Sequence, residues 1–203
     1  MEADCYKTIL KPNEESLFKD RGSKFYGYAF HVKTEDEVQV HIDTLKQEHH
    51  KARHWCYAYQ LGKQYDVWRA NDDGEPNNSA GMPIYDQLQS FELTNSLIVV
   101  VRYFGGTKLG VGGLINAYRT AAQMAVEASK IATRTINQEY VVLCDYKELN
   151  KVMRIIKEHN LKVTNQVMEM KCELTISVRE KEAANVFNIF DGIFGIDIKV
   201  LED

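Results

Sequence analysis

Hydrophobic positions in the first two thirds of this chain follow in turn the two-residue period of strands and the 3.6-residue period of helices. Strands are predicted at residues 24–32, 54–60, 65–70 and 97–101. Helices are predicted after the capping box at residues 34–37, at residues 80–91, and from a glycine-rich loop to about residue 131. Because the run at Leu97–Val101 contains no polar position, it predicts a central strand covered on both faces.

The last third of the chain shows the same two periods in another order. Strands are predicted at residues 139–144, 161–167, 172–178 and 196–200. One helix is predicted after a cap at Asp145, with Leu149, Val152, Met153 and Ile156 facing inward, and a second ends at Gly192. The order β-α-β-β-α-β is that of the ferredoxin-like split βαβ unit, a two-layer sandwich. We therefore expect an α+β protein with two domains, residues 1–134 and 135–203.

Charge and composition exclude several classes of protein. The chain has 25 Lys and Arg against 29 Asp and Glu, and neither expected domain is basic, so its whole surface does not attract nucleic acid. No apolar run approaches the ~20 residues of a membrane span. The four cysteines are far apart and none has CxxC spacing, which argues against a disulfide scaffold or a zinc site. We expect a cytoplasmic protein without membrane contact, structural metal or cofactor.

A strand, a glycine-rich loop and a small-residue helix follow one another between Leu97 and Tyr118. Residues 93–126 contain three basic side chains and no Asp or Glu. Loop amides, a helix N-terminus and Lys108 could hold a phosphate there, although the spacing is neither that of a dinucleotide loop nor that of a P-loop. The candidate ligand- or phosphate-binding residues are Arg102, Gly105, Gly106, Lys108, Gly110, Gly112, Gly113 and Arg119. Alternatively, the glycines only allow a tight turn, through positive φ, and close packing of the helix. Phosphate binding and a purely structural role of the glycines both stay open as interpretations.

An acidic loop offers a second candidate site. Asp72, Asp73 and Glu75 flank Gly74 and could ligate Mg²⁺ or transfer protons. Asp-Gly near a proline is also ordinary turn chemistry, and these carboxylates could instead pair with Lys108 or Arg102. Cys56 could act as a nucleophile beside a histidine, but its place in an apolar strand favours a buried, unreactive thiol. No catalytic residue is assigned; the observations favour binding over catalysis and leave an enzyme open.

Aromatic side chains are frequent on the strands predicted at residues 24–32, 54–60 and 65–70. If exposed, they could stack on single-stranded bases. Side chains alternate between the two faces of a strand, so only one parity could serve.

Four segments resemble the IMPACT family, and the two-domain layout is similar to its bacterial YigZ-type members. They are RGSKF (residues 21–25), HWCYAY (54–59), NDDGEPNNSAGMPI (71–84) and RYFGGTKLGVGGLINAY (102–118). The resemblance implies a left-handed βαβ fold for the first domain, as in a small-subunit ribosomal protein and domain IV of elongation factor G. For the second, it implies a ferredoxin-like fold like domain V of that factor.

The resemblance also implies a role in translation regulation. Together with the acid-free segment, it favours a cytoplasmic protein that binds RNA or the ribosome through the glycine-rich loop, with no DNA specificity. One alternative is an enzyme or sensor for a phosphorylated small molecule or nucleotide. A second is a protein-interaction module that works through the sheet of the second domain.

Overall fold

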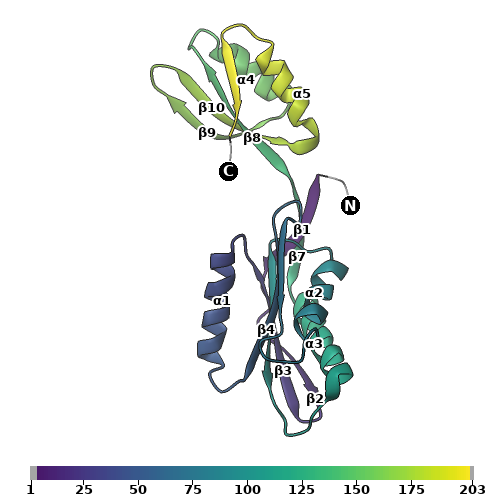
Figure 1. The fold of residues 1–203 in the computed structure, drawn as a ribbon. Helices are drawn as coiled ribbons and strands as arrows, with labels where there is room; N and C mark the ends of the chain where they lie inside the picture. The colour runs from purple at the N-terminus through teal and green to yellow at the C-terminus, as the bar shows by residue number, and fades with distance from the viewer. Residues whose placement is uncertain (1–3, 202–203) are drawn as a thin grey trace. The chain divides into compact units, whose positions relative to one another are not determined.

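The computed structural model describes residues 4–201, which form two compact units. One comprises Tyr6–Arg134, and the other comprises residues 135–201 together with Asp4 and Cys5 (Figure 1). Across residues 4–201, no helix combines the length and the apolar character that crossing a bilayer requires.

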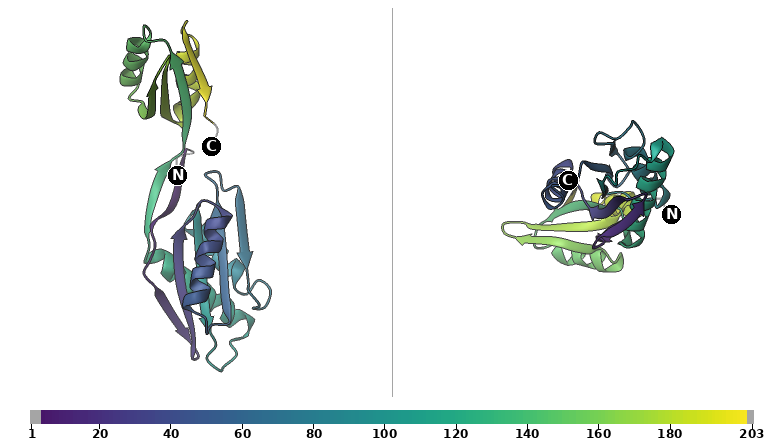
Figure 2. Two further views of the ribbon diagram at one scale, coloured as in Figure 1. Left: turned by 90° about the vertical axis from the view of Figure 1, so that its left-hand side faces the viewer. Right: turned by 90° about the horizontal axis from the view of Figure 1, so that it is seen from below.

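The first unit is built on a five-stranded antiparallel sheet with helices on both faces. Its strand order is β2 (Ser16–Asp20), β3 (Ser23–His31), β6 (Ser96–Tyr103), β4 (His54–Leu61) and β5 (Val67–Asn71). Helix α1 (Glu35–Glu48) covers one face, whereas α2 (Gly81–Ser90) and α3 (Gly110–Glu127) cover the other (Figures 1 and 2). The unit therefore has three layers.

Strand β6 lies at the centre of this sheet, and its apolar run divides by parity. Leu97, Val99 and Val101 pack in the cluster under α1, and Ile98 and Val100 pack in the cluster under α2 and α3. The prediction of a central strand buried on both faces is confirmed. The same alternation directs the next even-numbered residue, at position 102, toward α3.

Local signals explain where α1 begins and how α3 packs. In α1 the Thr34 hydroxyl accepts a hydrogen bond from the Glu37 amide, and the Glu37 carboxylate accepts one from the Lys33 amide. Helix α3 approaches the sheet closely because four of its seven buried residues are alanine. A Cβ on Gly27 of β3 would lie 2.5 Å from the carbonyl oxygen of Ala121.

The prediction of a helix continuing to about residue 131 is wrong. Helix α3 ends at Glu127, and β7 (Lys130–Thr135) pairs with β1 (Cys5–Lys11) in a separate two-stranded sheet. Strands β1 and β2 are not predicted either. Strand β7 is largely exposed, so its sequence lacks a strand-like alternation, and its pairing depends on a partner more than 100 residues away.

The second unit has the expected element order β-α-β-β-α-β. Its antiparallel sheet has the strand order β11 (Ile196–Val200), β8 (Asn137–Cys144), β10 (Cys172–Arg179) and β9 (Lys162–Met168). Helices α4 (Leu149–Glu158) and α5 (Glu180–Asp191) share one core cluster with it. Two details differ from expectation: Glu148, not Asp145, is the N-cap of α4, and Met153 is exposed.

Asp4 and Cys5 pack with the second unit instead of the first, contrary to the expected boundary at residues 1–134. The Asp4 carbonyl oxygen accepts a hydrogen bond from the Ile136 amide at 2.8 Å. The Asp4 carboxylate pairs with Arg179, with 2.5 Å between Oδ2 and Nε and 3.0 Å between Oδ1 and Nη2. These long-range contacts leave no local trace in the sequence.

We expect residues 135–203 alone to fold into a small α+β unit, because their six elements complete one two-layer core. Urea unfolding followed by circular dichroism should show a cooperative transition. The first unit separates Asp4 from residue 135 along the chain, so the fragment lacks the Asp4–Arg179 ion pair. We therefore expect the fragment to be less stable than the same unit in the full chain. Non-cooperative unfolding of the fragment would refute the prediction.

Candidate anion-binding site

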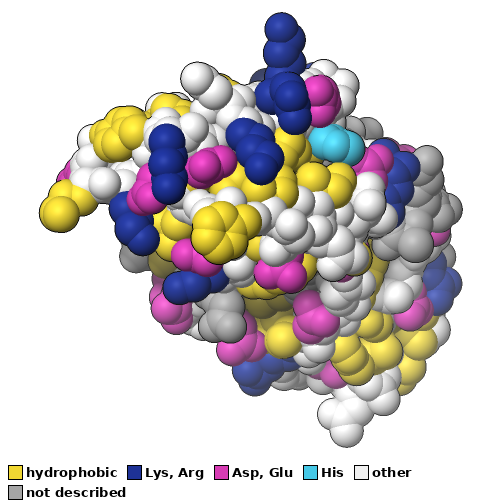
Figure 3. Space-filling view, turned by 90° about the horizontal axis from the view of Figure 1, so that it is seen from above, with side chains coloured by type: hydrophobic (Ala, Val, Ile, Leu, Met, Phe, Trp, Pro, Cys, Tyr) yellow, Lys and Arg dark blue, Asp and Glu magenta, His cyan; other side chains and the backbone are white. Residues whose placement is uncertain are grey.

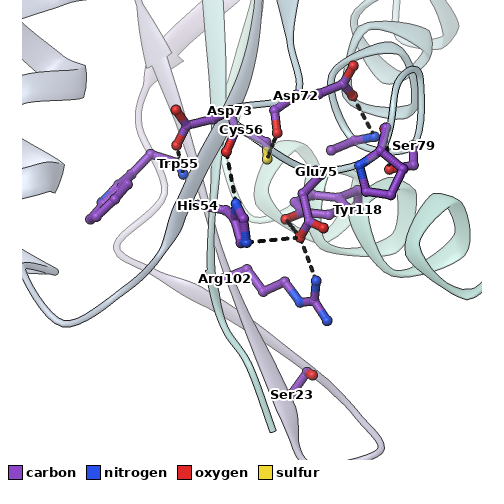
Figure 4. A network of polar contacts seen from close by, with 12 residues as sticks. Ser23, His54, Trp55, Cys56, Asp72, Asp73, Glu75, Ser79, Arg102 and Tyr118 are labelled. Atoms are coloured by element: carbon purple, nitrogen blue, oxygen red, sulfur yellow. Dashed lines mark hydrogen bonds and ion pairs between the residues drawn. The ribbon is translucent and has the colours of Figure 1, made fainter. Parts of the chain in front are cut away.

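The sheet register places three side chains in one row at the end of the central strands. Arg102 of β6 is the register partner of Phe25 on β3 and of His54 on β4. By strand alternation all three face α3. The row brings together parts of the chain that are far apart in sequence (Figure 4).

Arg102 is held by a buried ion pair. Its Nη1 donates to Glu75 Oε1 at 2.6 Å, and the hydroxyl of Tyr118 on α3 donates to the same oxygen at 2.7 Å. Arg102 is 5% exposed and Glu75 9%. Because a buried charge needs a partner, this pair fixes the loop that carries Glu75 against β6 and α3.

The rest of the Arg102 guanidinium has no hydrogen-bond partner among residues 4–201. Its Nε is buried and unpartnered. The guanidinium lies over the rings of Phe25 and Phe104, with 5.4 Å and 5.6 Å to the ring centroids. Such cation–π contacts hold the charge without using its remaining N–H donors.

Two neighbouring groups remain protonated. Burial raises the pKa of the Tyr118 hydroxyl well above its usual range, and Cys56 and Glu75 beside it raise it further. Burial likewise raises the pKa of the Cys56 thiol, which donates to the Asp72 carbonyl oxygen at 3.0 Å. A protonated, buried thiol is a poor nucleophile, so the geometry does not support the catalytic reading of Cys56.

The acidic loop divides into structural carboxylates and one that meets Arg102. Asp72 accepts hydrogen bonds from the amides of Asn78, Ala80 and Gly81, which tie it to the start of α2. Asp73 accepts one from the Trp55 amide at 2.7 Å. The sequence left open that any of these three carboxylates pairs with Arg102; in the structure, only Glu75 does so. Within residues 4–201, no group of three or more His, Cys, Asp or Glu side chains could hold a metal ion.

His54 completes the network from the side of β4. Its Nδ1 lies 2.8 Å from the Asp73 carbonyl oxygen and therefore donates to it, while its Nε2 lies 4.0 Å from Glu75 Oε1. The ring is an ion-pair partner of Glu75 only when it is protonated. Together, these hydrogen bonds and ion pairs position Glu75 and Arg102 (Figure 4).

A cavity of about 350 Å³ opens beside the Arg102–Glu75 pair. Arg102, Glu75 and Lys108 supply its charged groups, and Gly110 places the N-terminus of α3 at its wall. The apolar wall consists of Pro76, Phe104, Leu109, Val111 and Leu114. No side chain caps α3, and its first turn has no acidic residue, so its amides carry a partial positive charge without a local counter-charge.

The candidate residues of the glycine-rich segment separate into those that line this cavity and those that do not. Arg102, Lys108 and Gly110 line it. Gly106 and Gly110 have φ of +90° and +73°, so the loop requires glycine at both. Gly105 serves packing, because a Cβ there would lie 1.9 Å from the Gly22 carbonyl carbon. Gly112, Gly113 and Arg119 belong to α3 and are absent from the lining; the two glycines do not have positive φ.

Comparison with known proteins supports the resemblance to the IMPACT family that four segments of the sequence suggest. Residues 21–126 match the model of the Impact N-terminal domain. The chain is 33% identical over 183 residues to the IMPACT family member YvyE of Bacillus subtilis, covering 90% of this chain and 83% of that protein. The chain belongs to the IMPACT family.

A further relative agrees with this assignment, and a solved structure shares the fold. The IMPACT family member YigZ of Escherichia coli is 31% identical over 145 residues, which are 70% of this chain and 71% of that protein. The crystal structure of a hypothetical protein superposes with a TM-score of 0.70 over 98% of both chains, at 24% identity, and shows the shared fold. The match to YvyE spans 183 of the 203 residues and therefore includes residues of both units.

The four IMPACT segments named from the sequence all reach this site. Arg21 and Gly22, both with positive φ, form the two-residue turn between β2 and β3 that meets Gly105. The Ser23 hydroxyl accepts a hydrogen bond from the Gly105 amide at 3.1 Å. The second segment is β4 with His54, the third carries Glu75, and the fourth carries Arg102 and Tyr118.

Sequence reasoning missed the apolar half of the site. Phe104, Leu109, Val111 and Leu114 line the cavity but resemble ordinary packing residues in the sequence. The sequence does not indicate a role for Tyr118, because nothing around a tyrosine in an alanine-rich helix shows which group accepts a hydrogen bond from its hydroxyl. The available signal is the position of Phe104, an aromatic residue between a strand predicted to be buried and the glycine-rich loop.

We expect a single cysteine of the native protein to react readily with a thiol reagent. Cys5 is partly exposed, whereas Cys56, Cys144 and Cys172 are buried. In denaturant, all four should react. Rapid labelling of Cys56 in the native state, located by mass spectrometry, would reinstate it as a candidate nucleophile.

Proposed function

We propose that this protein is a translation-associated regulator that binds RNA or the ribosome through the cavity at the N-terminus of α3. The observation that carries the proposal is the convergence of Lys108, the uncapped first turn of α3 and the partly unpartnered Arg102 on one cavity. Helix N-termini and lysines are common phosphate ligands. A partner of this kind implies a cytoplasmic location.

The architecture supports the same proposal by analogy. The β-α-β-β-α-β order of the second unit matches a ferredoxin-like domain such as domain V of elongation factor G. For the first unit, the family resemblance implies a left-handed βαβ fold like domain IV of that factor. Both analogies point to the ribosome, although a fold by itself does not establish a function.

Few phosphates can be neutralised, so the affinity will be modest. Glu75 balances the charge of Arg102, which leaves Lys108 and the amides of α3 as the main attraction at the cavity. Residues 135–203 hold 12 Asp and Glu against 9 Lys and Arg, so the second expected domain carries no surplus of positive charge. On the face seen in Figure 3, acidic and basic side chains are interspersed and do not form a single basic patch.

We expect Lys108→Glu to reduce co-sedimentation with ribosomes at low salt by fivefold or more, on the order of one lost phosphate contact and one introduced repulsion. Arg119→Glu is the matched control. It makes the same change of charge on the same segment, at an exposed position outside the cavity, and should reduce binding much less. Equal losses for the two variants would show that general charge, and not the cavity, governs binding.

A small phosphorylated ligand is the second candidate, because the volume of the cavity lies in the range of small-molecule sites. A thermal-shift screen separates it from the first. A sugar phosphate or nucleotide present at 100 Kd should stabilise the protein by about 2.7 kcal/mol. Under the first proposal, the stabilisation comes from RNA fragments.

A further inference from the structure

We infer that the cavity accepts one unpaired nucleotide of an RNA strand, with the base inside against Phe104 and the phosphate at the rim beside Lys108 and the first turn of α3. The inference rests on the proposed function and names the ligand of its site. Three features of the cavity carry it: its apolar wall, its size and the polar pair at its end.

The apolar wall calls for a ligand with an apolar face as well as a charge. Five of the nine lining residues have apolar side chains, among them Phe104, which is 48% exposed. A phosphate alone would leave this wall in contact with water. An unpaired base would cover it, because base–aromatic stacking is favourable for every base.

The buried Glu75 argues against a bare anion deep in the cavity. A carboxylate repels a phosphate, and Oε2 of Glu75 makes no hydrogen bond within residues 4–201, so it remains an acceptor. Beside it, Arg102 also lines the cavity, and its Nη2 donates no hydrogen bond within residues 4–201, because the one side-chain bond of Arg102 is made by Nη1. An acceptor and a donor side by side complement the edge of a base, which presents both kinds of group. The phosphate then belongs at the rim, where Lys108 lies.

The size of the cavity limits the ligand to a single splayed nucleotide. A volume of about 350 Å³ is near the lower end of small-molecule sites. Bases in a duplex are stacked and paired and cannot enter a cavity of this size, whereas bases in single-stranded loops and ends can. We therefore expect selectivity for single strands, without strong sequence preference.

The test uses fluorescence anisotropy of the full chain with a labelled 12-nucleotide single-stranded RNA and with a hairpin of the same composition. Wild type should bind the single strand at least tenfold more tightly at low salt. Phe104→Ala should weaken single-strand binding by about fivefold or more, the loss of one stacked base. Trp68→Ala is the matched control: Trp68 is 51% exposed in the same unit but outside the cavity, and its removal should change affinity less than twofold.

Phe104→Trp guards against a folding artefact, because it keeps an aromatic surface and should retain the affinity. The last measurement uses free mononucleotides as competitors of the labelled strand. If a mononucleotide displaces the labelled strand as effectively as unlabelled strand does, the ligand is a free nucleotide and the inference is wrong.

The remaining outcomes separate this inference from the proposed function. Equal binding of strand and hairpin, weakened by Lys108→Glu but not by Phe104→Ala, would overturn the inference and leave the proposed function standing. Absence of any RNA or ribosome binding by the wild type would overturn both.

Discussion

Arg102→Met is expected to lower the free energy of unfolding by about 3–5 kcal/mol, because it leaves Glu75 buried without the charge that compensates it. Glu75 keeps only the Tyr118 hydroxyl as a firm hydrogen-bond donor, since His54 Nε2 is 4.0 Å away. Urea unfolding followed by tryptophan fluorescence measures the change.

A second variant separates the buried charge from lost packing. Combining Arg102→Met with Glu75→Gln removes both charges and keeps an oxygen that can accept from Tyr118, so the double variant should recover much of the stability. The exposed Lys7–Glu92 pair gives the control: Lys7→Met should change stability little, because exposed ion pairs contribute little. Equally small losses for Arg102→Met and Lys7→Met would disprove the structural role of the buried pair.

Gly105→Ala is the second variant with a large expected effect, a loss of about 3 kcal/mol, at the upper end of what overpacking causes. Its Cβ would lie 1.9 Å from the Gly22 carbonyl carbon and 2.2 Å from the Ser23 amide nitrogen. Both are backbone atoms, so no side chain can rotate away, and the loop must separate from the β2–β3 turn.

Gly112→Ala supplies a control of opposite sign. Gly112 lies in the first turns of α3, and an added Cβ there meets open space. Alanine should therefore raise the stability by about 0.5–1 kcal/mol, because it restricts the unfolded chain and favours the helix. Thermal unfolding of both variants checks the pair. A stable Gly105→Ala protein would contradict the packing role of Gly105.

The sequence predicts the regular elements well where one pattern dominates. The apolar run of β6, the capping box of α1 and the alternating strands of the second unit each carry a strong local signal. It fails at β1 and β7, because these strands pair with each other over more than 100 residues and because β7 is largely exposed. The ion pair between Asp4 and Arg179 likewise joins residues that are far apart in the sequence.

The candidate site divides in a similar way. The sequence indicates Arg102 and Lys108, because a basic segment without acids is visible along the chain. It leaves open which carboxylate of the acidic loop pairs with Arg102, since the contact with Glu75, 27 residues earlier, is created by the register of β4, β5 and β6. The apolar wall is invisible for a further reason: Leu109 and Leu114 differ from core residues only in facing a cavity.

The salt dependence of ribosome binding tests the central claim most directly. For wild type, the logarithm of affinity should fall with the logarithm of salt concentration with a shallow slope, about −0.7 to −0.9 per neutralised phosphate. Lys108→Glu should make the slope shallower by about one phosphate, while Arg119→Glu should leave it nearly unchanged. No binding at low salt, or identical slopes for wild type and Lys108→Glu, would contradict the assignment of the cavity as the binding site.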